Sequence, residues 1–167
     1  AINIAARAIQ NGDGEVYLAG GVESMSRAPY VFPKAETGFP FGNFTAFDTS
    51  LGWRFPNPIM ESKYGVDPMG ITAENLAEQY QISRDSQDIF AYHSHMKAIA
   101  AIDAGFFQNE IIPVQVPQRN GQDILVNQDE RPRRDTTIEK LSKLKPAFKK
   151  DGSVTGGNSS GLNDGAS

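Results

Sequence analysis

The sequence predicts an α/β fold, and two adjoining patterns support this prediction. Residues 1–10 have the apolar spacing of a helix, and the Asn11-Gly12 pair that follows is a typical helix C-cap. The short apolar run at residues 16–19 comes next and is closed by two glycines, as expected for a buried strand of a mostly parallel sheet. A helix, a tight turn and a buried strand in this order are typical of α/β proteins.

The first helix has no start signal in the sequence. Its apolar face comprises Ile2, Ala5, Ala6 and Ile9, but no N-cap residue precedes them and the sequence does not begin with Met. The other end, residues 155–167, reads TGGNSSGLNDGAS and is more specified than a simple mobile tail. We therefore expect an internal piece of a longer protein, with the start of the first helix upstream.

The α/β pattern breaks at Val22, and no sustained periodicity returns before about Met69. An irregular segment of this length inside a compact domain usually has a function or an interface, and its aromatic residues argue against disorder. The rings could form a small satellite core under the loop, or they could contact a partner subunit. The aromatic residues are Tyr30, Phe32, Phe39, Phe41, Phe44, Phe47, Trp53 and Phe55.

Two helices are predicted after the irregular segment. Thr72 is a suitable N-cap for a helix from Ala73 to about Tyr80. Ser83 is a suitable N-cap for a longer helix over residues 84–104, which Gly105 would end.

A hairpin and a short helix are predicted next. Residues 111–114 and 123–126 have the composition of strands, and residues 118–121 between them read QRNG, a hairpin signal. Thr136 and Glu139 stand at capping-box spacing and predict a helix over residues 138–144, which Pro146 would end.

Composition excludes several functions. A net charge of −4 argues against a nucleic-acid-binding protein as a whole. No apolar run approaches the roughly 18 residues of a membrane span, and no charged-then-apolar leader is present, so we expect a protein without a membrane partner. There is no cysteine, which excludes disulfides, thiolate metal sites and a cysteine nucleophile within these residues. That absence is compatible with a reducing compartment, and we expect a cytoplasmic protein.

Positive charge is concentrated in residues 131–150, which we call the basic window. It holds eight basic residues and two acids, so its net charge of +6 leaves −10 for the remainder of the chain. This pattern indicates either a site for a local anionic ligand or a solvated helix face.

No catalytic or metal site can be assembled from the sequence. His93 and His95 stand two residues apart on a predicted helix and do not share a face, so they are a poor metal pair and are expected to be ordinary surface or half-buried histidines. Neither a nucleophile elbow nor a phosphate-binding GxxxxGK[ST] or GxGxxG motif is present. The basic window, the glycine-rich end, Met60 and Met69 together suit an adenine-bearing phosphate cofactor with a long arm.

Several segments, read in order, resemble one family. Residues 20–29 read GGVESMSRAP and resemble the GG-x-ESMS-x-AP segment of thiolases, the acyl-CoA acyltransferases. The resemblance covers essentially the whole chain. The aromatic run at residues 52–55, with residues 64–66, is most similar to the degradative branch, including the 3-oxoadipyl-CoA type. Further matches are residues 69–75 to MG-x-TAEN, 83–88 to SR-x-x-QD, 144–148 to L-x-PAF, 152–155 to GTVT and 158–166 to N-x-SG-x-NDGA.

The resemblance implies an incomplete α/β domain with a large insertion. The family has two similar halves, each a five-stranded sheet between helices, and an α+β loop domain inserted in the first half. By this resemblance, residues 1–24 are the late part of the first half. Residues 25–153 would form the loop domain, with coenzyme A and oligomer contacts, and residues 154–167 would return to the first half.

The resemblance also implies acyl transfer between a 3-oxoacyl-CoA and coenzyme A. A cysteine takes the acyl group, a histidine activates that cysteine, and a second cysteine exchanges a proton with the incoming acetyl-CoA. We expect all three residues to lie outside this chain, the first a few residues upstream of Ala1 and the others beyond Ser167. No catalytic residue is therefore assigned, and the chain by itself is expected to be inactive.

The resemblance also assigns coenzyme A-binding positions to residues of this chain. Coenzyme A and acyl-CoA are the implied substrates, with no covalently bound cofactor. Pro68 stands where some biosynthetic thiolases have histidine, which favours the degradative branch. Arg133 matches the arginine near the adenine and phosphates, Phe148, Gly156 and Ser160 match positions along the pantetheine and adenine, Met69 matches the methionine of the acyl tunnel, and Met60 matches a nearby apolar position.

Two other functions stay open at this stage. The chain could be a non-catalytic module that binds coenzyme A or an acyl group. It could instead serve subunit assembly, because thiolase loop domains contact other subunits and residues 32–55 are rich in aromatic side chains. The full protein is expected to be a homo-oligomer, a dimer or a tetramer.

Overall fold

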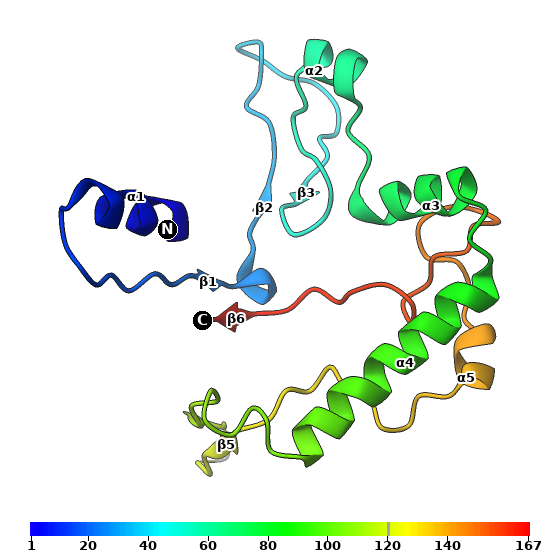
Figure 1. Cartoon of the computed structure of the whole chain (residues 1–167). Helices are drawn as coiled ribbons and strands as arrows, with labels where there is room; N and C mark the ends of the chain where they lie inside the picture. Colours follow the sequence, from blue (N-terminus) through cyan, green and yellow to red (C-terminus); the bar gives the residue numbers. More distant parts are fainter. Residues whose placement is uncertain (120) are drawn as a thin grey trace. The chain divides into compact units, whose positions relative to one another are not determined.

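A computed structural model describes residues 1–119 and 121–167, and Figure 1 traces them in sequence order. The chain forms two compact units. The first unit comprises Ala1–Pro68 and Leu162–Ser167, and the second comprises Met69–Gly161.

The first helix agrees with the prediction. α1 spans Ile2–Asn11, and Gly12 ends it in the left-handed conformation with φ 78°. At that angle glycine avoids the steric penalty that a Cβ would cause. Ala1, at the N-cap position, provides no side-chain hydrogen bond, in line with the missing start signal in the sequence.

The predicted buried strand at residues 16–19 is wrong. These residues are extended but pair with no strand among the described residues, and Val16 and Leu18 are 86% and 101% exposed. A strand of a parallel sheet needs neighbouring strands and a layer over each face, which the described residues do not supply here. The sheet contact lies further along, where β1 (Val22–Glu23) pairs antiparallel with β6 (Gly165–Ala166).

The irregular segment contains short elements that the sequence analysis did not predict. A 3-10 turn over Met25–Arg27 precedes β2 (Tyr30–Val31), which pairs antiparallel with β3 (Phe47–Asp48). The helix α2 spans Pro58–Tyr64, and its N-cap Asn57 accepts a hydrogen bond from the backbone N–H of Ile59. An N-cap asparagine followed by proline at the first helical position is a known start signal, and it could have been recognised.

The aromatic residues of this segment do not form a satellite core, so that interpretation is wrong for the described residues. Phe39 is 85% and Phe41 97% exposed. In the described part of the chain, the ring contacts of this segment are two pairs, Phe32–Phe44 and Phe47–Phe55, each with a centroid distance of 5.2 Å. The described residues supply no further layer of side chains to cover them.

Two helices open the second unit. α3 spans Met69–Gln79, so it starts before the predicted Ala73, and Thr72 lies inside the helix rather than at its N-cap. α4 spans Arg84–Asp103 and begins as predicted, with the Ser83 side chain accepting a hydrogen bond from the backbone N–H of Ser86. The left-handed Gly105, with φ 75°, follows its end.

The predicted hairpin is confirmed with shifted bounds. β4 (Val114–Val116) pairs antiparallel with β5 (Ile124–Val126), with Gln115 opposite Leu125. The first strand begins after Pro113 because proline has no N–H to donate to a ladder. The predicted turn at residues 118–121 includes Asn120, which lies outside the described residues.

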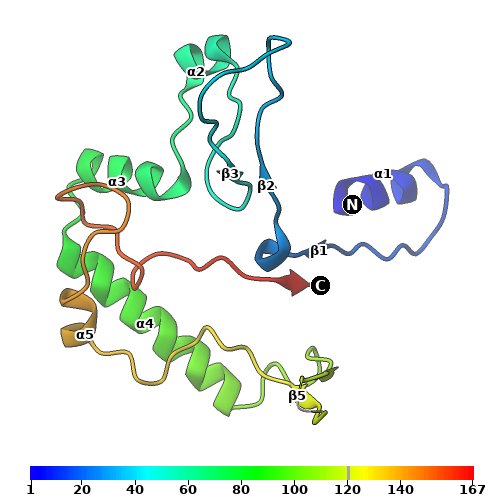
Figure 2. The same ribbon diagram turned by 180° about the vertical axis from the view of Figure 1, so that it is seen from behind.

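The predicted short helix is confirmed, but its cap is not. α5 spans Ile138–Ser142, and the Thr137 side chain accepts from the backbone N–H of Lys140 at 3.2 Å. Thr137, not Thr136, is therefore the N-cap. The segment before α5 runs beside α4 in both views of the chain (Figure 1; Figure 2). Beyond α5, Pro146 forms an isolated antiparallel bridge with Thr155.

A buried carboxylate on α3 holds residues 152–160, which we call the closing segment. Glu74 is 4% exposed and accepts hydrogen bonds from the backbone N–H of Val154 at 2.8 Å and of Ser153 at 2.9 Å, and from the Ser153 hydroxyl at 3.1 Å. A Cβ at Gly152 would overlap the Glu74 carboxylate, so this close approach requires glycine. Burial tends to raise the pKa of Glu74, but these hydrogen bonds and the nearby Lys149 charge hold the pKa below its ordinary value.

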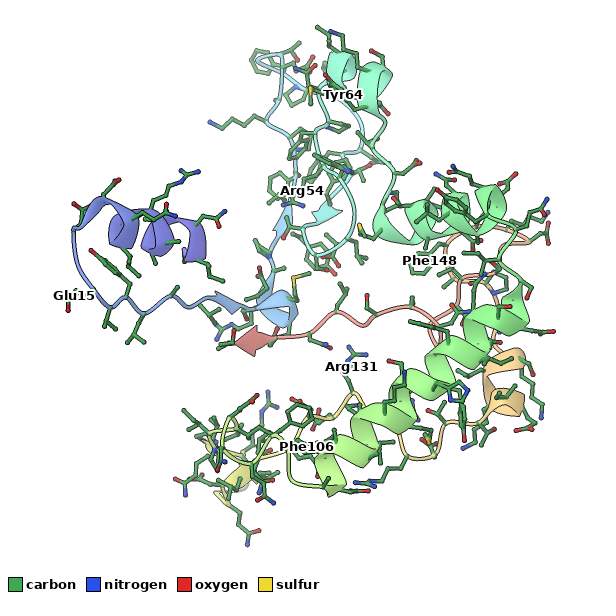
Figure 3. The ribbon with its side chains drawn as sticks, in the orientation of Figure 1. Glu15, Arg54, Tyr64, Phe106, Arg131 and Phe148 are labelled. Atoms are coloured by element: carbon green, nitrogen blue, oxygen red, sulfur yellow. The ribbon has the colours of Figure 1, made fainter. Side chains whose placement is uncertain are left out.

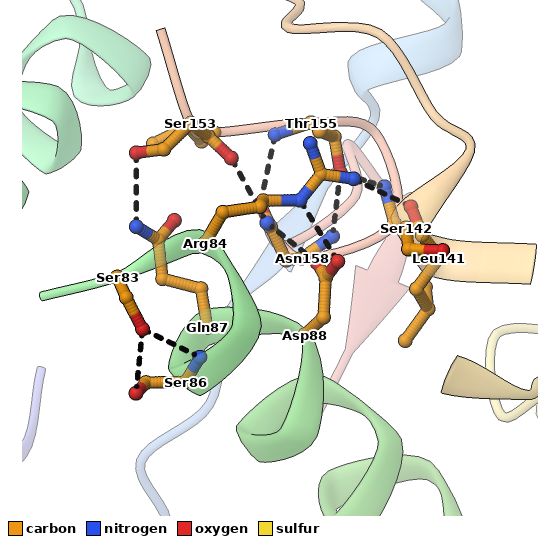
Figure 4. Close-up of polar contacts among 12 residues, drawn as sticks. Ser83, Arg84, Ser86, Gln87, Asp88, Leu141, Ser142, Ser153, Thr155 and Asn158 are labelled. Carbon is orange, nitrogen blue, oxygen red and sulfur yellow. Dashed lines mark hydrogen bonds and ion pairs between the residues drawn. The ribbon is translucent and has the colours of Figure 1, made fainter. Parts of the chain in front are cut away.

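A second buried carboxylate, on α4, completes the same network (Figure 4). Asp88 is 1% exposed and accepts from Arg84 Nε at 2.8 Å and from Asn158 Nδ2 at 3.0 Å. The Asn158 side-chain oxygen in turn accepts from the backbone N–H of Thr155 at 2.8 Å. Gln87 Nε2 donates to the Ser153 hydroxyl at 2.9 Å. Within the described residues, every buried polar side-chain atom has a hydrogen-bond partner.

None of the helices in the described part of the chain is long and apolar enough to span a membrane.

We expect the two threonines before α5 to differ in their contribution to stability. Thr137→Ala removes the cap and should lower the free energy of unfolding by about 1 kcal/mol. Thr136→Ala should change it by less than about 0.5 kcal/mol. Urea unfolding of both variants measures the difference, and an equal loss from the two would contradict the assigned cap.

Glu74 should give the fold a specific acid sensitivity. Its folded pKa lies below the ordinary value of 4.5, so its stabilising contribution is complete above that pH and is lost as the pH falls through the folded value. Glu74→Gln should lower the free energy of unfolding at neutral pH by about 1–3 kcal/mol, because an amide N–H would face backbone donors. The variant should also lose less stability than the parent between pH 4.5 and pH 3. Parallel pH profiles in urea unfolding would contradict this assignment.

Candidate functional site

The closing segment presents two of the sequence-predicted positions at the surface of the second unit. Gly156 and Ser160 are both exposed, while Thr155 beside them is fully buried. A Cβ at Gly156 would meet no atom within 4 Å, so a ligand could approach its backbone closely. Gly157 instead packs against Leu141 and Leu144. The segment is therefore anchored by its buried residues and is open at residues 156 and 160.

Phe148 packs against the glycine that follows Met69. The Phe148 ring lies against Gly70 at the start of α3, where a Cβ would overlap the ring (Figure 3). Met69 precedes this glycine and is 81% exposed. The structure thus brings an aromatic ring and a flexible thioether to the same end of α3, both accessible and both suited to contact an apolar part of a ligand.

Arg133 lies on the segment that runs beside α4. Its backbone N–H donates to Nδ1 of His95 at 3.2 Å, and its Nε donates to Asp135 at 3.4 Å. The side chain is 68% exposed, so the guanidinium is accessible to an anion. The next residue, Arg134, forms a two-point ion pair with Asp103 on α4.

Ion pairs partly neutralise the basic window. Hydrogen bonds from Lys140 and then Arg133 hold the pKa of Asp135 below its ordinary value, and a hydrogen bond from Arg134 does the same for Asp103. Lys149 pairs with Glu78 at 3.2 Å. These contacts agree with a solvated surface for much of the window. Arg133 combines an exposed guanidinium with a backbone hydrogen bond to His95.

Arg131 was not among the predicted site residues, yet its guanidinium lies against Gly161, the residue that follows the closing segment. A Cβ at Gly161, directly after Ser160, would overlap the Arg131 guanidinium, which Figure 3 labels. The only sequence signal for this contact is the glycine after Ser160, and a glycine alone does not indicate which side chain packs against it. Met60 is 53% exposed and belongs to α2 in the first unit, whereas the five other predicted positions belong to the second unit.

The histidines behave as ordinary side chains. His93 is exposed and its ring centroid lies 5.5 Å from that of Tyr92, whereas His95 is half-buried and accepts the Arg133 N–H. In the part of the chain that the structure describes, no group of three or more histidine, aspartate or glutamate side chains could hold a metal ion.

Comparison with known proteins places the chain in a family. The family model described as "Thiolase, N-terminal domain" matches residues 1–167. The β-ketoadipyl-CoA thiolase of Acinetobacter baylyi is 53% identical over 167 residues, which is 99% of this chain and 41% of that protein. The β-ketoadipyl-CoA thiolase of Pseudomonas putida is 54% identical over 166 residues, with the same coverage.

Solved structures agree with these relatives. The Bacillus anthracis acetyl-CoA acetyltransferase superposes with a TM-score of 0.84 at 45% identity, covering 100% of this chain and 40% of that one. Human mitochondrial 3-ketoacyl-CoA thiolase gives 0.82 at 39% identity. The chain spans about two fifths of the length of these proteins, which agrees with an incomplete α/β domain. The family model, the relatives and the superpositions agree over the whole chain, which belongs to the thiolase family.

Proposed function

We propose that this chain holds the coenzyme A part of the substrate in an enzyme that transfers an acyl group between a 3-oxoacyl-CoA and coenzyme A. The observation that supports it best is the anchoring of the closing segment by Glu74 and Asp88. It gives Gly156 and Ser160 a fixed base in the same unit as Phe148, Met69 and Arg133.

The chemistry of these positions suits each part of coenzyme A. A guanidinium such as that of Arg133 binds phosphate oxygens through paired N–H donors. The exposed Phe148 ring and Met69 thioether suit the adenine or the apolar pantetheine arm. Gly156 allows the arm to approach the backbone, and Ser160 offers a hydroxyl. Met60, in the first unit, is proposed separately as an apolar substrate-binding position.

We propose that the acyl-enzyme forms outside this chain. The sequence has no cysteine, so neither the nucleophile nor the proton-exchanging cysteine can be one of its residues. This chain matches 41% of the Acinetobacter relative, and we propose that both cysteines lie in the part that corresponds to the remainder. The names of the relatives favour a 3-oxoadipyl-type substrate and the degradative branch, and we expect the protein in the cytoplasm.

We further propose that the chain has three parts. Residues 1–24 belong to the first thiolase half, residues 25–153 form the inserted loop domain, and residues 154–167 return to the first half. The pairing of β1 with β6 supports the return, because it joins Val22 to Ala166 across most of the chain.

Coenzyme A binding should depend on Arg133. Isothermal calorimetry of the protein with coenzyme A should give a measurable affinity, and Arg133→Ala should weaken it by about 10- to 100-fold through loss of charge-assisted hydrogen bonds. Arg119→Ala is the matched control, since it removes an exposed arginine outside the basic window, and it should change the affinity less than about twofold. Equal effects of the two substitutions would count against the assigned role of Arg133.

The isolated 167 residues should not catalyse thiolysis. With coenzyme A and acetoacetyl-CoA or 3-oxoadipyl-CoA, we expect no turnover above the uncatalysed rate, because no thiol is available to accept the acyl group. Turnover by this chain would refute the proposal that the acyl-enzyme forms outside it. The protein expressed from its complete reading frame should be active, and its inactivity would favour a non-catalytic coenzyme A-binding module.

The exposed aromatic residues favour a second role in subunit assembly. Phe32, Phe41 and Trp53 are 61%, 97% and 65% exposed, and large exposed apolar groups gathered in one segment often mark an interface. We propose that residues 32–55 contact another copy in a dimer or tetramer.

Sedimentation velocity tests this assembly role. The protein expressed from its complete reading frame should sediment as a dimer or tetramer. Phe41→Ser combined with Trp53→Ser should shift it toward smaller species, because both rings would leave the interface. A well-folded parent that stays monomeric at all concentrations would contradict the assembly role.

A further inference from the structure

His95 makes a contact that connects two distant parts of the second unit. Its Nδ1 atom accepts a hydrogen bond from the backbone N–H of Arg133 at 3.2 Å, although 38 residues separate them. A neutral imidazole that accepts at Nδ1 has its proton on Nε2. The ring is half-buried on α4, whereas His93, two residues earlier, is exposed.

In the described part of the chain, two contacts join Arg133 and Arg134 to α4. One is the His95 hydrogen bond to the backbone of Arg133, and the other is the ion pair of Arg134 with Asp103. Between the arginines and α5, Lys140 donates to both the side chain and the backbone carbonyl of Asp135. The second attachment joins the Arg134 side chain to α4. A local turn, in which the Thr136 backbone N–H donates to the Arg133 carbonyl at 3.3 Å, also holds the backbone at residue 133, but it does not join that backbone to α4.

The side chain of Arg133 has little else to hold it. Its contact with Asp135 is long, at 3.4 Å, and joins two side chains that are 68% and 59% exposed. Ion pairs of this kind contribute little in water, since solvent screens them and both side chains lose conformational freedom. The hydrogen bond to its own N–H is therefore the contact that holds the backbone of Arg133 against α4.

We propose that His95 is a positioning residue for coenzyme A binding, acting through the backbone of Arg133. This inference rests on the proposed function, in which the Arg133 guanidinium binds phosphate. By fixing the backbone before the ligand arrives, His95 reduces the ordering that binding would otherwise require. The role needs an acceptor atom at the place of Nδ1 and does not need a basic side chain.

Three substitutions distinguish the effect of the hydrogen-bond acceptor from the effect of the ring itself. His95→Phe keeps a ring of similar size but cannot accept a hydrogen bond. His95→Asn places its side-chain oxygen near the position of Nδ1 and should restore the contact. His93→Phe is the matched control on the same helix, because His93 is exposed and its ring lies against Tyr92, whereas the hydrogen bond to Arg133 is made by His95.

The protein expressed from its complete reading frame is titrated with coenzyme A and with pantetheine, which lacks the nucleotide and its phosphates. His95→Phe should weaken coenzyme A binding by about three- to tenfold and leave pantetheine binding unchanged. His95→Asn and His93→Phe should stay within about twofold of the parent for both ligands. Combining His95→Phe with Arg133→Ala should weaken coenzyme A binding no further than Arg133→Ala alone, as expected for residues that act together.

The outcomes distinguish the inference from the proposed function. If Arg133→Ala weakens coenzyme A binding and His95→Phe does not, the positioning role is refuted and the proposed function stands. If Arg133→Ala has no effect, both are refuted. Equal weakening of coenzyme A and pantetheine by His95→Phe would show a general loss of structure and would also refute the positioning role.

A measurement on the parent protein does not depend on how the variants fold. Long-range proton–nitrogen NMR spectra should show His95 with its proton on Nε2 and an unprotonated Nδ1 at neutral pH. A proton on Nδ1 would refute the hydrogen bond and the inference with it.

Discussion

Two buried carboxylates, Glu74 on α3 and Asp88 on α4, are the constraint on which the second unit depends. A buried charge is costly unless hydrogen bonds compensate it, and each of these charges takes donors from the closing segment. The two helices therefore depend on donors from the closing segment, and the closing segment depends on acceptors from the two helices. Without the closing segment, Glu74 would lose its backbone donors and Asp88 would lose Asn158 while keeping Arg84, so the three parts stabilise one another.

This dependence separates the structural motifs from the ligand-binding positions. Two residues of the motifs that carry the family resemblance, Glu74 in TAEN and Asp88 in SR-x-x-QD, lie in the buried network. The residues proposed to meet coenzyme A, such as Phe148 and Ser160, lie at or near the surface beside that network. The buried network holds the closing segment in place, and the exposed positions supply the proposed contacts with coenzyme A.

The sequence predicted those parts of the fold that local chemistry determines. Ser83 and Gly12 were recognised because a cap depends on a few neighbouring residues. The strand at residues 16–19 was not correct, because a buried strand requires partners that a local pattern cannot guarantee. In the candidate site, family positions indicated Phe148 and Arg133, but Arg131 and His95 were missed because their contacts join residues far apart in the sequence.

Hydrogen exchange measured by NMR, residue by residue, tests most directly whether the closing segment is a fixed base for coenzyme A. The backbone N–H groups of Ser153, Val154 and Thr155 should exchange slowly with and without coenzyme A, because Glu74 and the Asn158 side chain hold them. Protection at Gly156 and Ser160 should rise only when coenzyme A is added. Exchange at residues 153–155 as fast as at the exposed residues of the hairpin would contradict the account.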